Sequence, residues 1–90
     1  MLSIAVCDDE LLDRVTISAG IRLAMKELNM PCSIELFASG RELLDALGRF
    51  DLIFLDILMN GMDGMETARK CREQMFEILL VFLSSSRSYV

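Results

Sequence analysis

Residues 52–56 read Leu52-Ile53-Phe54-Leu55-Asp56, an apolar run that ends in a carboxylate. Residues 4–10 have the same form, since Ile4-Ala5-Val6-Cys7 is followed by Asp8-Asp9-Glu10. In a parallel sheet the carboxyl ends of the strands open onto one edge, and ligands bind there. If these two strands are neighbours, their ends lie about 5 Å apart. We therefore expect Asp8, Asp9 and Asp56 to share one pocket.

The composition limits what kind of protein this is. The chain has 90 residues, of which 53% are hydrophobic, and a formal net charge of -5. This length suits one small domain over residues 1–90. A chain this short buries a smaller fraction of its surface than a larger domain, so its apolar excess predicts either a piece of something larger or a surface for a partner. The acidic charge argues against a nucleic-acid interface and against binding to an anionic membrane.

The cysteines and the chain start indicate the compartment. Cys7, Cys32 and Cys71 are odd in number and form no C-x-x-C pair, and the chain has no histidine. A zinc site and a histidine-based catalytic triad are therefore not expected. Residues 78–83 form an apolar run too short to span a bilayer, and residues 1–4 show no signal-peptide pattern. We expect buried, reduced thiols and a cytoplasmic location.

Short apolar runs alternate with longer amphipathic stretches, which predicts a parallel sheet covered by helices. The expected strands are residues 2–6, 33–37, 52–55 and 78–83, and the expected helices are residues 11–28, 39–48 and 63–75. The last two strands are apolar throughout, which is typical of strands covered on both faces. Right-handed crossovers with helices on both faces favour an α/β fold of the flavodoxin-like, doubly wound type with strand order 2-1-3-4.

The helices carry end signals and apolar faces. Ser39 to Glu42 is a capping-box pattern, Asp63 with Glu66 repeats it, and Gly48 is expected to end the second helix. Two sets of residues recur at helical spacing: Ile17, Ile21, Ala24, Met25 and Leu28 in the first helix, and Met65, Ala68, Cys71 and Arg72 in the third.

The predicted pocket has a definite chemistry. Two like charges about 4 Å apart repel by roughly 4 kcal/mol at an effective dielectric of about 20. Either one carboxylate holds a proton or a cation neutralises the group. A site of oxygen ligands suits Mg²⁺, which commonly joins carboxylates to a phosphoryl group. Ser84 follows the fourth strand and should lie at the same edge of the sheet.

Plainer interpretations remain open for several of these residues. Asp8 to Glu10 could be a helix cap with first-turn acids, and Ser84 an ordinary loop residue. The methionines at positions 59, 62 and 65 could form a soft-metal site, although packing is the simpler role. No nucleotide-binding glycine loop follows the first strand.

Two stretches resemble a known family. They are Ile4-Ala5-Val6-Cys7-Asp8-Asp9-Glu10 and residues 51–64, which end Asp56-Ile57-Leu58-Met59-Asn60-Gly61-Met62-Asp63-Gly64. Over residues 2 to 88 the chain resembles the receiver domain of bacterial two-component response regulators. Residues 37–44, Phe-Ala-Ser-Gly-Arg-Glu-Leu-Leu, are similar to receivers that precede a LytTR-type DNA-binding domain and so serve in transcription regulation.

The resemblance implies a role for each site residue. Asp56 would accept a phosphoryl group from a phosphohistidine on a sensor histidine kinase. Asp9 would bind Mg²⁺ directly and Asp8 largely through water, and the backbone carbonyl of Leu58 would be a further ligand. Ser84 would be the switch hydroxyl. Such a domain catalyses its own phosphorylation and turns over no external substrate, so it is not an enzyme in the usual sense.

The chain departs from the family pattern at two places. Asn60 stands where the family usually has proline, which should loosen the loop without touching the chemistry. The family's last helix, strand and helix, with a lysine that contacts the phosphoryl group, have no counterpart, and no lysine follows Lys70. We expect a C-terminally incomplete receiver domain over residues 1–90, with no output domain within these residues and with the fourth strand as an exposed apolar edge.

Two other functions are alternatives to this one. The first is a protein-interaction fragment that cannot be phosphorylated, paired as a homodimer or higher oligomer through the fourth strand or the first helix. The second is a Mg²⁺-dependent phosphohydrolase. It would need an Asp-x-Asp pair, which Asp56-Ile57-Leu58 does not supply.

Overall fold

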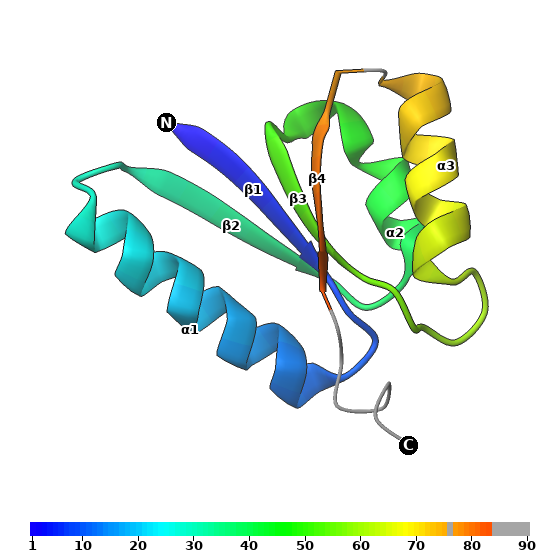
Figure 1. Cartoon of the computed structure of the whole chain (residues 1–90), viewed down its shortest axis with the longest axis horizontal. Helices are drawn as coiled ribbons and strands as arrows, with labels where there is room; N and C mark the ends of the chain where they lie inside the picture. The colour runs from blue at the N-terminus through cyan, green and yellow to red at the C-terminus, as the bar shows by residue number, and fades with distance from the viewer. Residues whose placement is uncertain (76, 84–90) are drawn as a thin grey trace.

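The structure is a computed structural model that describes residues 1–75 and 77–83. Strands and helices alternate along the chain, as the sequence predicts (Figure 1). The elements are β1 (Leu2–Cys7), α1 (Leu11–Glu27), β2 (Cys32–Phe37), α2 (Gly40–Asp45), the 3₁₀ helix η1 (Leu47–Arg49), β3 (Leu52–Asp56), α3 (Gly64–Gln74) and β4 (Leu79–Leu83).

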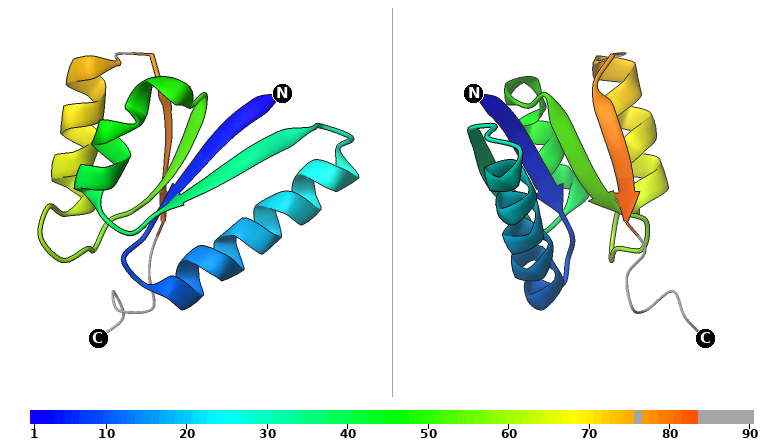
Figure 2. Two further views of the ribbon diagram at one scale, coloured as in Figure 1. Left: turned by 180° about the vertical axis from the view of Figure 1, so that it is seen from behind. Right: turned by 60° about the vertical axis from the view of Figure 1, so that its left-hand side comes forward.

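The four strands form one parallel sheet in the order β2-β1-β3-β4. Helix α1 lies on one face, whereas α2 and α3 lie on the other (Figures 1 and 2). The flavodoxin-like, doubly wound arrangement is therefore confirmed. From β1 the chain adds β2 on one side of the sheet and then β3 and β4 on the other, so the switch point of this parallel sheet lies between β1 and β3. In such folds ligands bind in the crevice at the carboxyl ends of the two strands at the switch point.

Alternate residues of β1 belong to two separate cores. Ile4 and Val6 face α1 and pack with Ile21. Ala5 and Cys7 face α2 and α3, in a larger cluster that includes Leu43, Ile53, Leu55 and Cys71. Burial of apolar surface on both faces holds the central strands in place. It also leaves the polar residues that follow β1 and β3 at fixed positions.

The predicted helix caps are present. The Glu42 N–H donates to Ser39 Oγ at 3.2 Å, and the Ser39 hydroxyl donates to a Glu42 carboxylate oxygen at 2.9 Å. The Glu66 N–H donates to Asp63 Oδ1 at 2.9 Å. These bonds satisfy backbone donors that the first helical turn leaves without partners.

Other details of the helices differ from the prediction. Helix α2 ends at Asp45, not at Gly48, because the N–H of Ala46 bonds to the carbonyl of Leu43 and the chain tightens into η1. On the predicted face of the first helix, Ala24 is exposed, and so is Leu28, which follows the end of α1. The contacts with the sheet run through Ile21, which is buried, and through the half-buried Ile17 and Met25.

Helix α3 buries one side of the predicted face. Ala68 and Cys71 are buried, whereas Met65 is 58% exposed and Arg72 is exposed. The buried positions are Gly64, Thr67, Ala68 and Cys71, so the stripe is turned away from Met65. Among the cysteines, Cys7 and Cys71 are buried as predicted, Cys32 is half-buried, and none forms a disulfide.

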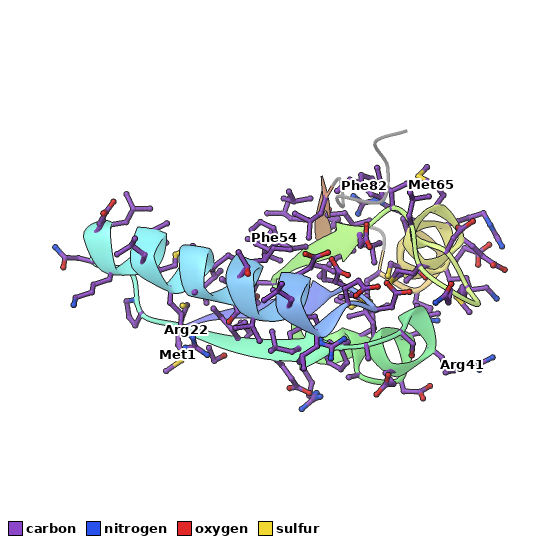
Figure 3. The ribbon with its side chains drawn as sticks, turned by 90° about the horizontal axis from the view of Figure 1, so that it is seen from below. Met1, Arg22, Arg41, Phe54, Met65 and Phe82 are labelled. Atoms are coloured by element: carbon purple, nitrogen blue, oxygen red, sulfur yellow. The ribbon has the colours of Figure 1, made fainter. Side chains whose placement is uncertain are left out.

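Strand β4 is not covered on both faces. Leu79, Val81 and Phe82 are 64%, 40% and 42% exposed. Its neighbour β3 has Phe54 on the α1 side, paired in register with Val81, while α1 itself packs on β1 and β2 (Figure 3). Strand β4 is therefore apolar throughout, like a strand buried on both faces, although three of its side chains are exposed. No helix in the described ranges is long and apolar enough to cross a membrane.

Candidate phosphoacceptor and metal site

The strand register brings the acidic residues to one edge. Cys7 of β1 pairs with Leu55 of β3, so the residues that follow them, Asp8 and Asp56, are neighbours. The Asp8 N–H donates to the Phe37 carbonyl at 3.0 Å, which extends the β1–β2 ladder by one step. Both aspartates therefore stand on the ends of central strands, where their positions are set by the sheet.

The structure brings together the three carboxylates that the sequence singled out. One carboxylate oxygen each from Asp8, Asp9 and Asp56 lies within 4.8 Å of the other two. The side chains of Asp8 and Asp56 are 1% and 0% exposed, and Asp9 is half-buried. Two aspartates this deeply buried are rare unless they are paired or bind a ligand.

Main-chain amides hold each carboxylate. The Glu10 N–H donates to Asp8 Oδ1 at 2.9 Å, and the Leu58 N–H donates to Asp56 Oδ1 at 3.2 Å. The Asn60 N–H donates to Asp9 Oδ2 at 2.9 Å. These bonds orient the three carboxylates before any ligand arrives.

The helix-cap interpretation of the first acidic cluster does not hold. The N-cap residue of α1 is Glu10, and its side chain makes no capping bond. The carboxylate of Asp8 instead accepts from the amide of Glu10, two residues on, in a local turn outside the helix. The acid in the first turn of α1 is Asp13.

The electrostatics of the site favour a cation. The pKa of Asp8 is raised from 3.8 to about 6, chiefly by burial and also by the negative charges of Asp56, Asp13 and Asp9. The hydrogen bond from the Glu10 amide lowers this pKa but does not offset burial. Without a cation, an ionised Asp8 is therefore costly here.

The donor set fits Mg²⁺. The group consists of carboxylates, which are the ligands of a hard divalent ion. The nearby thiol of Cys7 is unsuited to a metal, because burial raises its pKa to about 12 and it lies 3.7 Å from the Met59 sulfur as a hydrogen-bond donor. Leu58 lies beside Asp56 through its amide, and the role of its carbonyl stays a prediction. Ser84 lies outside the described residues.

The β3–α3 loop, residues 57–63, closes one side of the site. Met59 is buried against Cys7, whereas Met62 is half-buried and Met65, just beyond the loop, is exposed. The packing role predicted for these methionines is thus correct for Met59 and wrong for Met65. Gly61 has a φ of 75°, a left-handed conformation that glycine adopts without strain.

Sequence reasoning missed two contacts at this edge. Arg14, in α1, donates from its guanidinium to the Asp8 carbonyl at 2.8 Å, so a positive charge lies beside the first acidic loop. The Asn60 N–H donates to Asp9 Oδ2, a hydrogen bond that a proline at this position could not make. The sequence did offer a signal for Arg14, because it lies in the first turns of the helix that follows Asp8, Asp9 and Glu10. A main-chain amide such as that of Asn60 gives no signal of its own.

Solved structures share this fold over nearly the whole chain. The chemotaxis protein CheY4 of Vibrio cholerae is 26% identical, with 97% of this chain and 73% of that chain covered and a TM-score of 0.78. Response regulator TrrA of Thermotoga maritima, solved with Mg²⁺ and BeF, is 27% identical, with 99% and 75% covered and a TM-score of 0.81. The REC domain of AraT, a response regulator of Geobacillus stearothermophilus, is 26% identical, with 98% and 67% covered and a TM-score of 0.71. No curated protein sequence matches the chain.

A doubly wound parallel sheet with three carboxylates at its switch point defines a class of α/β domains with an acidic site. The family model of the response regulator receiver domain matches residues 4–90. The chain belongs to this family, and its role is that of a phosphoacceptor signalling domain of a two-component system.

Proposed function

We propose that this domain takes a phosphoryl group from a phosphohistidine of a sensor histidine kinase onto Asp56, with Mg²⁺ bound by Asp8, Asp9 and Asp56. The observation that carries the proposal is the position of Asp56. Its carboxylate is fully buried at the end of a central strand, and it lies within 4.8 Å of two further carboxylates. A site of this kind suits a nucleophile that needs charge neutralisation before an anionic donor can approach.

The proposed reaction transfers the phosphoryl group from a histidine nitrogen of the kinase to a carboxylate oxygen of Asp56. A carboxylate oxygen of Asp56 attacks phosphorus, the phosphorus–nitrogen bond to the histidine breaks, and an acyl phosphate forms on Asp56. The histidine nitrogen keeps the electron pair of the broken bond. Bound Mg²⁺ would neutralise charge on the phosphoryl oxygens. In this chain the Leu58 amide orients Asp56, and Asp8 and Asp9 supply the negative charge that attracts the ion.

The test uses a phosphoryl analogue on the whole chain. Beryllofluoride with Mg²⁺ should raise the unfolding temperature of the wild type, and either component alone should do so less. Asp56→Asn, which keeps the shape of the side chain, should abolish the effect of beryllofluoride. Asp45→Asn, at an exposed position at the end of α2, is the matched control and should respond like the wild type. A full response in the Asp56→Asn protein would sink the assignment.

The kinase partner, the cytoplasmic location and an output through a LytTR-type DNA-binding domain are parts of the same proposal. The family supports the kinase, and the three thiols outside any disulfide support a reducing compartment. Under this proposal the domain receives the phosphoryl group from the kinase and catalyses only its own phosphorylation. It is therefore not an enzyme that turns over an external substrate.

A second candidate function is favoured by the exposed side of β4. Leu79 and Val81 are open to solvent on the α1 side of the sheet. Among the described strands, β4 has one neighbour, β3, so its outer edge can pair with another chain. We propose that this edge forms a homodimer. In the extreme case the domain would act only as an interaction module, and beryllofluoride would then leave the wild type unchanged.

A further inference from the structure

One hydrogen bond joins the two loops that form the acidic site. The Asn60 N–H of the β3–α3 loop donates to Asp9 Oδ2 at 2.9 Å, across 51 positions of sequence. The geometry of Asp8 and Asp56 is set differently: each accepts from an amide two residues further along its own loop. Asp9 is thus tied to the loop that follows the other strand.

Of the three carboxylates, that of Asp9 is the least buried. Asp8 and Asp56 are almost fully buried and stand directly on strand ends, whereas Asp9 is half-buried and one residue further from β1. A half-buried side chain has more rotamer freedom than a fully buried one, and ordering it when it binds an ion costs free energy. A hydrogen bond that holds the carboxylate beforehand reduces this cost.

We propose that the main-chain amide of Asn60 is a positioning group for the metal site, which fixes Asp9 through Oδ2 so that it is oriented for Mg²⁺. This inference rests on the proposed function. A carboxylate has two oxygens and about four lone-pair positions, so one amide bond leaves room for a metal bond and for water. Hydrogen bonds to ligating carboxylates are a common way of orienting them.

The bond also couples the loop to the ion. Residues 57–63 join Asp56 to α3, and the amide of Asn60 lies in the middle of this loop. Binding of an ion by Asp9 should therefore order the loop, and order in the loop should favour binding, because the two effects are reciprocal. Any residue except proline can provide this donor.

Two variants separate the amide from the side chain. Asn60→Pro removes the N–H, whereas Asn60→Ala keeps it and removes only an exposed side chain. Mg²⁺ is titrated into metal-free protein, and binding is followed by shifts of backbone amide signals in NMR spectra. We expect affinity within about twofold of the wild type for Asn60→Ala, and about tenfold weaker for Asn60→Pro. Equal or tighter binding by the Asn60→Pro protein overturns the inference, as does an equal loss in both variants.

Hydrogen exchange of the Asn60 amide provides a readout that does not need the proline variant to fold. In the wild type this amide should exchange more slowly than that of the exposed neighbour Gly61, and Mg²⁺ should slow it further. Exchange of Asn60 as fast as that of Gly61 overturns the inference while leaving the metal site intact. A wild type that binds no Mg²⁺ at all overturns the metal part of the proposed function and this inference with it.

Discussion

Gly64 approaches Asp56 so closely that a Cβ added to it would lie 2.0 Å from the Asp56 carbonyl oxygen and 2.6 Å from the Ile57 Cα. Both contacts are to backbone, which cannot rotate away as a side chain can. The Gly64 N–H also donates to the Ile57 carbonyl at 3.0 Å. The first residue of α3 therefore rests directly on the chain that carries the phosphoacceptor.

Gly64→Ala should destabilise the domain and disturb the site. Crowding of a packed position commonly costs about 1–3 kcal/mol, and here the group that must move is the backbone of Asp56. We expect a lower midpoint of urea unfolding together with a weaker response to beryllofluoride and Mg²⁺.

Gly20→Ala is the control for this change. Gly20 lies in the middle of α1, and among the described residues nothing beyond its chain neighbours and the helix's own backbone lies within 4 Å of the Cβ position. The substitution should stabilise the helix by about 0.5–1 kcal/mol and leave the response to beryllofluoride intact. If both variants gained stability, the close approach of α3 to Asp56 would be refuted.

The sequence predicts those parts of the fold that depend on local chemistry. Ser39 and Asp63 cap their helices through bonds to residues three positions on. The strand order is the simplest doubly wound order that right-handed crossovers allow, and its prediction rests on the known flavodoxin-like topology. Two features escaped prediction for physical reasons. The amide of Asn60 is identical in every non-proline residue, so its partner depends on the path of two loops. The apolar run of β4 has the same pattern whether or not a helix covers it.

The stability of the metal-free protein should depend on the ionisation of Asp8. Its pKa is raised by burial from 3.8 to about 6, so between these values the folded state binds more protons than the unfolded state. The contribution of Asp8 to stability is therefore present below pH 3.8 and lost as the pH rises through 6. Asp8→Asn removes this titration.

Urea unfolding of both proteins in the presence of a chelator checks this dependence. We expect Asp8→Asn to gain stability relative to the wild type as the pH rises from about 4 to about 7. Gln74→Asn, at an exposed position on α3, changes no titratable group and is a control that should show no such trend. A gain for Asp8→Asn that is the same at both ends of the range would contradict the buried titration.

Mg²⁺ should stabilise the folded protein through the three carboxylates. An ion that binds only the folded state at about 100 times its dissociation constant adds about 2.7 kcal/mol. The urea midpoint should rise accordingly in the wild type, and the rise should be reversed by a chelator. Asp9→Ala should lose most of this increase, whereas Asp51→Ala, at the opposite end of β3, should keep it. An equal increase in both variants would mean that the ion binds elsewhere.

Self-association through β4 should respond to charge at Val81. This side chain is 40% exposed on the open side of the edge strand, and a lysine there would have to be desolvated by a second chain. We expect light scattering to show a dimer for the wild type at high concentration and a monomer for Val81→Lys. Met65→Lys places the same charge at a 58% exposed position on α3 and should remain dimeric. A wild type that stays monomeric at every concentration would rule out this interface, while a dimer unaffected by Val81→Lys would place it on another surface.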